Sequence, residues 1–201
     1  MHLVCLDLEG VLVPEIWLAV AQATGIKELA RTTRDEPDYD VLMRFRLDIL
    51  KRNDIRIADI QKIIQTLKPL RGARTFIQWL HSQTRVIILS DTFVEFAAPL
   101  MKQLGFPTLF CHSLVIDASG HITNYRLRQS DQKYKAVQAF QSLNFKVIAA
   151  GDSYNDLTML QAADHGILFR PPASLVKAYP QLPVTRRHNE LRIAIEKILN
   201  A

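Results

Sequence analysis

Short apolar runs, separated by stretches long enough for helices, dominate the hydrophobic pattern of this chain. The first run, residues 3–6, is followed by Asp7 and Glu9 and then breaks at Gly10. Comparable runs occur at residues 85–90, 109–111, 146–150 and 167–169. Continuous apolar runs of this length are typical of strands buried on both faces of a parallel sheet. We interpret the last of them as the strand that closes the sheet.

Helical periodicity fills most of the intervals between these runs. The expected helices cover residues 73–82, 94–104, 131–143, 155–163 and 189–199. Residues 114–122 favour a β-hairpin with Ser119 and Gly120 in its turn. The alternation of strands and helices predicts an α/β fold with a mostly parallel sheet and right-handed crossovers.

The first strand and the next α/β unit are about 60 residues apart, which exceeds a usual crossover connection. The expected elements of this interval are a helix at 15–24 closed by Gly25, a polar break at 26–38, and helices at 42–52 and 57–67. We therefore expect a core domain of residues 1–11 and 71–201, with a helical cap domain of residues 12–70 inserted into it.

Composition narrows the class of protein. With 201 residues and 48% hydrophobic content, the chain suits one globular domain with a substantial insertion. No apolar stretch approaches a membrane span, and the first strand starts too early for a cleavable signal, so we expect no membrane partner. Cys5 and Cys111 have apolar neighbours, which favours reduced thiols in a cytoplasmic protein. The net charge of +5 is scattered, so we expect no nucleic-acid partner.

The first candidate chemistry is the acid pair after the opening strand. Side chains alternate along a strand, so Asp7 and Glu9 are expected on one side, about 7 Å apart along the backbone. Acids at the carboxyl edge of a central strand lie where open α/β sheets bind ligands. Two like charges this close repel each other unless a cation accompanies them. The pattern therefore indicates a metal ion.

Four short motifs stand after buried strands or at a helix start. They are Asp7–Leu12, Ile88–Asp91, Lys133 within Asp131–Lys135, and Gly151–Asp156. In this order and at these intervals they resemble the motifs of the haloacid dehalogenase-like phosphotransferases, over nearly the whole chain. The resemblance implies a Rossmann-like core with an inserted cap, and phosphoryl transfer through an aspartyl phosphate.

The same resemblance implies a role for each motif. Asp7 would be the nucleophile, and Glu9 the general acid and then the general base. Ser90 would donate its hydroxyl, and Asp91 its main-chain N–H, to phosphoryl oxygens. Lys133 would neutralise the charge that builds on the phosphoryl group.

The metal implied by the family is Mg²⁺. Asp7, the main-chain carbonyl of Glu9 and Asp152 offer hard oxygen ligands, and Asp156 would support them. Asn155, within the same motif, is expected to contact substrate. Asp152 and Asp156 could also cap a helix, a role compatible with metal binding.

The cap segment carries the substrate clues, because the chain is similar to phosphoserine phosphatases. In that family a Glu after the first motif binds the substrate amino group, and a cap Arg binds its carboxylate. Glu15 and Arg46, within Met43–Leu47, occupy the matching places. An ammonium requires a carboxylate, and a carboxylate suits a guanidinium fork. Without the resemblance, we would interpret Glu15 and Arg46 as ordinary charged residues on the surface of the cap.

Three motifs depart from the family pattern. The first motif has Glu9 where most relatives have Asp, which moves the carboxylate by about 1.5 Å. Residues 91–93 replace the glycines that usually follow the serine, and residues 153–154 replace small residues. With these features the chain is similar to bifunctional bacterial members that also pass the phosphoryl group to homoserine. This implies roles in serine and threonine biosynthesis, with phosphoserine and homoserine as substrates.

Other interpretations stay open at this stage. A receiver-type signalling domain also uses an aspartyl phosphate, Mg²⁺ and a Lys, although the insertion and Glu9 argue against it. A binding module that kept the fold without activity, and a phosphatase for another small phosphate ester, are further alternatives. The oligomeric state is open, a homodimer being one alternative.

Overall fold

The computed structural model describes residues 1–33, 35, 36 and 38–201. Its strands form a single mixed sheet. Arg34 and Pro37, part of the predicted polar break, lie outside the described residues. The sheet has the order β4-β3-β2-β1-β5-β6-β7. Its strands are β1 (His2–Leu6), β2 (Arg85–Phe93), β3 (Thr108–Ile116), β4 (Ile122–Arg126), β5 (Lys146–Gly151), β6 (His165–Phe169) and β7 (Val184–Thr185). Only the β3–β4 pair among these is antiparallel, so the predicted fold class is confirmed.

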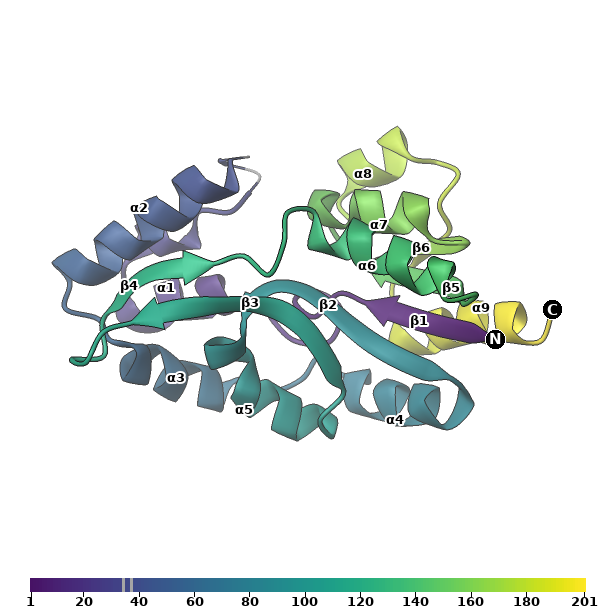
Figure 1. The fold of residues 1–201 in the computed structure, drawn as a ribbon, viewed down its shortest axis with the longest axis horizontal. Helices are drawn as coiled ribbons and strands as arrows, with labels where there is room; N and C mark the ends of the chain where they lie inside the picture. The colour runs from purple at the N-terminus through teal and green to yellow at the C-terminus, as the bar shows by residue number, and fades with distance from the viewer. Residues whose placement is uncertain (34, 37) are drawn as a thin grey trace.

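Helices cover both faces of the sheet (Figure 1). One face carries α4 (Ala73–Gln83), α5 (Val94–Leu104) and α9 (His188–Leu199). The other carries α6 (Gln132–Ser142), α7 (Leu157–Ala162) and α8 (Ala173–Ala178), with the 3₁₀ turn η2 (Tyr154–Asp156) ahead of α7. The helices lie close to their predicted ranges, except that α8 was not predicted.

Strand β1 lies at the centre of the sheet because its side chains fill both hydrophobic layers. Val4 and Leu6 belong to the layer under α4, α5 and α9, whereas Leu3 and Cys5 belong to the layer under α6 to α8. This alternation explains the continuous apolar run, since a strand covered on both faces has no side exposed to water. Cys5 is a free thiol, and its burial raises its pKa.

Three sequence predictions need correction. The opening strand ends at Leu6 rather than continuing to Glu9, because Leu8 is buried and its carbonyl accepts turn hydrogen bonds from Leu12 and Val13. Strand β3 is much longer than the predicted residues 109–111, since it runs on into the hairpin. The sheet also continues past Phe169 to β7. This strand has only two residues, which is too short to show a periodic pattern in the sequence.

Residues 12–70, which we call the insertion, leave the sheet after β1 and return before β2. They contain α1 (Ile16–Thr24), the 3₁₀ turn η1 (Lys27–Ala30), α2 (Tyr39–Arg52) and α3 (Ile57–Thr66). Helix α3 packs on α5, and α2 packs on the β4 edge of the hairpin. The division into a core domain of 1–11 and 71–201 and a cap domain of 12–70 stays a prediction.

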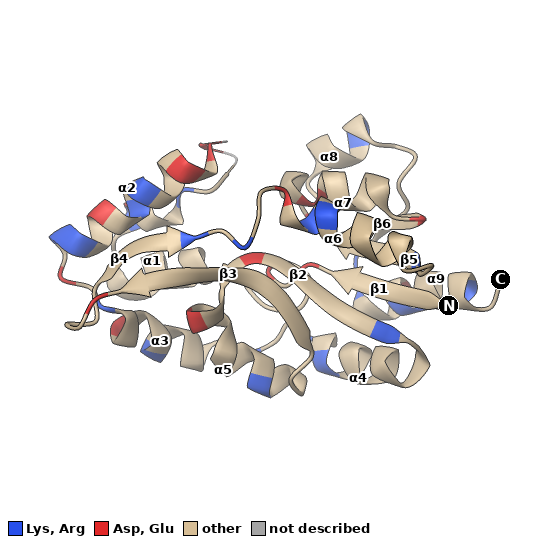
Figure 2. Cartoon of the chain, in the orientation of Figure 1, with Lys and Arg blue, Asp and Glu red and all other residues tan. Residues whose placement is uncertain are grey.

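Charge is spread over the molecule. Lys and Arg lie on α2 to α6, α8 and α9, on both faces of the sheet (Figure 2). Among the described residues, none of the helices combines the length and the apolarity that a bilayer crossing requires. The expectation of no nucleic-acid partner stays a prediction.

The two ends of the insertion are held together by the last helix of the chain. Leu70 donates its N–H to the carbonyl of Leu12 at 2.9 Å. The ring nitrogens of His188, on α9, lie 2.8 Å from the Val11 carbonyl oxygen and 3.0 Å from that of Arg71. His188 and Val11 are both buried, so the Val11 carbonyl has little access to water. The C-terminal helix thus fixes the two points where the chain enters and leaves the insertion.

We expect His188→Phe to lower the free energy of unfolding by about 1–3 kcal/mol, because at least one buried carbonyl loses its donor. Urea unfolding monitored by circular dichroism measures this change. His165→Phe, on an exposed histidine at the start of β6, is the control and should change stability by less than about 0.5 kcal/mol. Equal changes in the two variants would contradict the assignment.

Candidate active site

Asp7 and Asp152 follow two neighbouring parallel strands of the sheet. β1 pairs with β5, and Leu6 lies opposite Ala150 at their carboxyl ends. Asp7 follows β1 and donates its N–H to the Ala150 carbonyl at 3.0 Å. Asp152 follows β5 directly. Both acids therefore stand at the carboxyl edge of the sheet, where α/β folds place ligands.

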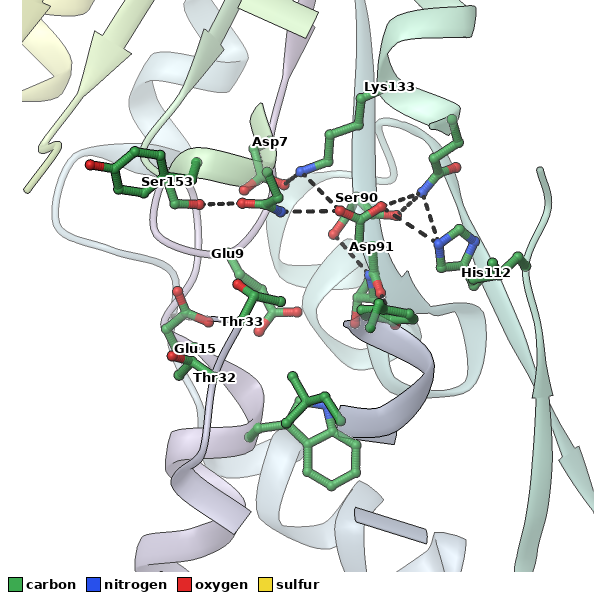
Figure 3. A pocket seen from close by; sticks show the side chains of 18 of the residues that line it. Asp7, Glu9, Glu15, Thr32, Thr33, Ser90, Asp91, His112, Lys133 and Ser153 are labelled. Carbon is green, nitrogen blue, oxygen red and sulfur yellow. Dashed lines mark hydrogen bonds and ion pairs between the residues drawn. The ribbon is translucent and has the colours of Figure 1, made fainter. Parts of the chain in front are cut away.

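Lys133 joins this edge from the first turn of α6. Its Nζ lies 3.0 Å from Oδ1 of Asp7 (Figure 3). The same Nζ lies 2.7 Å from Oδ1 of Asp156, and all three side chains are buried. Burial alone would lower the pKa of Lys133, but the charges of Asp156 and Asp7 raise it well above its usual value. Burial and the Asp156 charge raise the pKa of Asp7, against the opposing effect of Lys133.

The three buried carboxylates form a set that suits a hard cation. Asp7, Asp152 and Asp156 each offer an oxygen within 4.8 Å of the others. Gly10 leaves them room, because a Cβ there would lie 2.5 Å from Cγ of Asp152. Gly10 also has a φ of 76°, which favours glycine. Oxygen-only ligands of this kind fit Mg²⁺.

Asp156 also has the capping role considered from the sequence. Its Oδ2 accepts the main-chain N–H groups of Asp152 at 2.9 Å and Ser153 at 3.1 Å. Gly151 makes this approach possible, since a Cβ there would lie 2.4 Å from Cγ of Asp156. Capping and membership of the acidic cluster thus coexist in one side chain. Both of its oxygens are engaged, which suits a supporting role beside the cluster.

Glu9 reaches the site from a turn, not from a strand. Its Oε2 accepts the N–H of Ile16, the first residue of α1, at 2.7 Å. Burial raises the pKa of Glu9 to about 7, and the nearby charge of Glu15 adds to the rise. A carboxyl group with a pKa near neutrality can both give and accept a proton under physiological conditions.

Ser90 and Asp91 lie on the other side of β1, near the end of β2. Ser90 is buried, and its Oγ accepts the N–H of Thr92 at 3.3 Å. Asp91 faces Lys133 at 3.6 Å and accepts hydrogen bonds from Gln132 and Asn155, both at 3.1 Å. Burial alone would raise the pKa of Asp91, but Lys133 and these donors lower it far below its usual value. Asp91 is therefore a fixed anion.

The insertion supplies Arg46 and Glu15 from α2 and the start of α1. Arg46 is 6% exposed, donates Nη2–H to the Arg31 carbonyl at 2.7 Å, and stacks on Trp17 at 4.6 Å. Within the described structure its Nε is buried without a hydrogen-bond partner. Burial lowers the pKa of Arg46 to about 10, so the guanidinium stays charged at neutral pH. Glu15 is exposed at the N-terminus of α1.

One cavity of about 640 Å³ brings these groups together. Of the residues predicted from the sequence, those that line it are Asp7, Glu9, Glu15, Arg46, Ser90, Asp91, Lys133, Asp152 and Asn155. Asp156 does not line it and lies behind Lys133. The cavity thus has acids and a lysine at the sheet edge, and an arginine on the insertion.

Sequence reasoning missed several residues of this cavity. Tyr39, Thr92, His112 and Gln132 line it, and none was predicted. His112 accepts the Arg128 N–H at Nδ1, which leaves Nε2 as the protonated nitrogen that faces Asp91. The sequence carries little signal for Tyr39 and Gln132, because their partners lie 52 and 42 residues away along the chain.

The comparisons with known proteins agree with this site. The model of the haloacid dehalogenase-like hydrolase family matches residues 1–164. The chain belongs to that family and is an enzyme of the hydrolase class. Neither the match nor the insertion supports the receiver-type alternative.

Two bacterial relatives are similar over nearly the whole chain. The phosphoserine phosphatase of Pseudomonas syringae pv. tomato is 54% identical over 200 residues, covering 100% of this chain and 84% of the relative. The phosphoserine phosphatase ThrH of Pseudomonas aeruginosa is 56% identical over 192 residues, covering 96% and 94%. A solved phospho-aspartyl intermediate analogue of phosphoserine phosphatase has a TM-score of 0.80 at 21% identity and covers 98% of each chain, which shows the shared fold.

We expect Gly10→Ala to raise the Kd for Mg²⁺ at least about tenfold, because the new methyl group displaces the Asp152 carboxylate. Isothermal titration calorimetry of the purified protein measures this. Gly25→Ala is a matched control, since Gly25 has a φ of 74° but nothing within 4 Å of its Cβ. Both variants carry similar backbone strain, so equal Mg²⁺ affinities in the two would rule out this account of Gly10.

Proposed function

We propose that this enzyme is a Mg²⁺-dependent phosphoserine phosphatase that forms an aspartyl phosphate on Asp7. It passes the phosphoryl group to water or to homoserine. The observation that carries this proposal is the buried Nε–H of Arg46, which lacks an acceptor within the described structure; the residue itself lines the same cavity as Asp7 and Lys133. A buried charged donor without an acceptor is costly, and a substrate carboxylate would supply one.

In the first half-reaction, an Asp7 carboxylate oxygen attacks the phosphorus of phosphoserine. The Asp7 O–P bond forms as the ester P–O bond breaks, and Glu9 gives its proton to the leaving serine oxygen. Lys133, the Ser90 hydroxyl and the Asp91 N–H balance the charge on the phosphoryl oxygens. When bound by Asp7, Asp152, the Glu9 carbonyl and the supporting Asp156, Mg²⁺ would supply further neutralisation of this charge.

In the second half-reaction, a hydroxyl oxygen attacks the phosphorus and Glu9 takes its proton. The Asp7 O–P bond breaks, which restores the carboxylate and releases either inorganic phosphate or O-phosphohomoserine. Glu9 alternates between acid and base, and its pKa of about 7 suits both roles.

Substrate recognition rests on both parts of the cavity. Arg46 would bind the amino-acid carboxylate and Glu15 its ammonium group. Asn155, which is hydrogen-bonded to Asp91, would contact the substrate beside the phosphoryl group. Homoserine has the same two charged groups and one more methylene than serine, so the same side chains would hold it.

The proposed substrates indicate the pathways in which the enzyme acts. We infer roles in serine and threonine biosynthesis, in the cytoplasm. A homodimer stays a prediction. The alternative activity is a phosphatase for another small phosphate ester, which would need neither Arg46 nor Glu15 for binding.

The central test is a product assay on phosphoserine with and without homoserine. We expect serine and phosphate from phosphoserine alone, and O-phosphohomoserine once homoserine is in excess. Asp7→Asn should remove both products, since an amide is a poor nucleophile, with activity falling at least about a thousandfold. Absence of O-phosphohomoserine above background would remove the transferase half, and phosphoserine left intact would remove the whole proposal.

A second experiment separates phosphoserine from other esters. Arg46→Ala should raise KM for phosphoserine by about a hundredfold, because a charge-assisted bidentate contact is lost, and leave p-nitrophenyl phosphate hydrolysis nearly unchanged. Arg44→Ala is the control, since Arg44 lies on the same helix but is exposed and paired with Asp40. Equal loss on both esters in Arg46→Ala would favour the alternative activity.

A further inference from the structure

Strand β2 leaves its ladder beside the phosphoryl-binding residues. It pairs in register with β3 up to Leu89 opposite Phe110, and the register shifts before Phe93 opposite His112. Residues 90–92 therefore lie in an irregular segment. Main-chain carbonyls released from a ladder need other donors when they are buried.

Side chains from two distant elements supply those donors. Gln132, on α6, donates its amide N–H to the Ser90 carbonyl. Tyr39, the first residue of α2 in the insertion, donates its hydroxyl to the Asp91 carbonyl at 3.0 Å. The Tyr39 contact joins positions 52 residues apart in the chain. It reaches the segment that presents the Ser90 hydroxyl and the Asp91 N–H to the cavity.

The peptide between Asp91 and Thr92 is consequently held at both ends. Its carbonyl accepts from Tyr39, and its N–H donates to Oγ of Ser90 at 3.3 Å. A trans peptide is planar, with C=O and N–H on opposite sides, so turning one turns the other. The direction of the carbonyl set by Tyr39 thus sets the direction of the N–H that holds Oγ. With that oxygen lone pair occupied, the Ser90 hydroxyl proton remains available for a phosphoryl oxygen.

Tyr39 is well suited to hold a fixed direction. Its ring packs edge-on against Tyr125 at 5.9 Å and His112 at 6.3 Å. Burial raises the pKa of its phenol, so the hydroxyl keeps its proton and remains a donor. A donor in this position also fixes α2, whose Arg46 lines the same cavity.

We propose that Tyr39 is a positioning residue that couples the insertion to the Ser90 hydroxyl through the Asp91–Thr92 peptide. The inference deepens the proposed function, since it assumes that Ser90 donates to the phosphoryl group. When α2 is seated, Tyr39 aligns this donor for transfer. Loss of the Tyr39 hydroxyl would release the peptide, and the donor would lose its alignment.

Tyr39→Phe keeps the ring and removes only the hydroxyl. We expect kcat to fall about tenfold on phosphoserine and on p-nitrophenyl phosphate, with KM changed much less, because the lost alignment matters in the transition state. Tyr125→Phe is the control: its hydroxyl bonds to Asp40 on the same helix and does not contact residues 90–92. Thermal unfolding of both variants checks that the fold is kept.

A double-mutant cycle with Ser90→Ala tests the route of the effect. If Tyr39 acts through Ser90, adding Tyr39→Phe to Ser90→Ala should lower kcat by less than about twofold further. A further tenfold loss in the double variant, or an unchanged kcat in Tyr39→Phe alone, would overturn the inference. If wild type leaves phosphoserine intact, the proposed function fails, yet the same cycle on p-nitrophenyl phosphate still decides the role of Tyr39.

Discussion

A buried ion cluster at the carboxyl edge of β1 and β5 is the constraint on which the rest of the site depends. Asp7, Asp152 and Asp156 carry like charges in a place with little water, and Lys133 lies 3.0 and 2.7 Å from two of them. Buried charges persist only when they are paired and hydrogen-bonded. One lysine does not neutralise three acids, so the cluster favours a divalent cation. Gly10 keeps the space beside this cluster open, because a Cβ there would lie 2.5 Å from Cγ of Asp152.

Residues of the sheet edge and residues of the insertion together line the cavity. The sheet edge and α6 supply the acids and Lys133, which we propose bind the phosphoryl group, and the insertion supplies Arg46 and the start of α1. Glu9 belongs to both parts, because its carboxylate accepts the first N–H of α1 at 2.7 Å. The longer side chain of Glu, compared with Asp, extends toward that helix end. Glu9, the proposed acid–base group, is therefore tied, like Ser90, to a segment that the sheet alone does not position.

Much of the site could be predicted because each of its motifs is local. An apolar run followed by an acid predicts a carboxylate at a strand end, and parallel strands bring such ends to one edge. The placement of Asp7, Ser90 and Asp152 was therefore accessible from sequence. The continuation of the first strand to Glu9 was wrong, since local alternation does not reveal that Leu8 turns inward. Strand β7 was missed because a strand of two residues is too short to show the alternation of side chains that marks a strand.

The sequence by itself determined most of the strands and helices along the chain, although not α8 and β7, together with the acids at the strand ends and the presence of an inserted helical segment. Hydrophobic periodicity and family motifs are local features of the sequence, so they can be recognised without knowing which residues are in contact in the fold. Only the tertiary structure decided which polar groups from distant parts of the chain satisfy one another. Tyr39 meets Asp91, and His188 meets Val11, across separations that no local pattern encodes. The physical reason is that a buried carbonyl accepts any donor that the folded chain brings within reach.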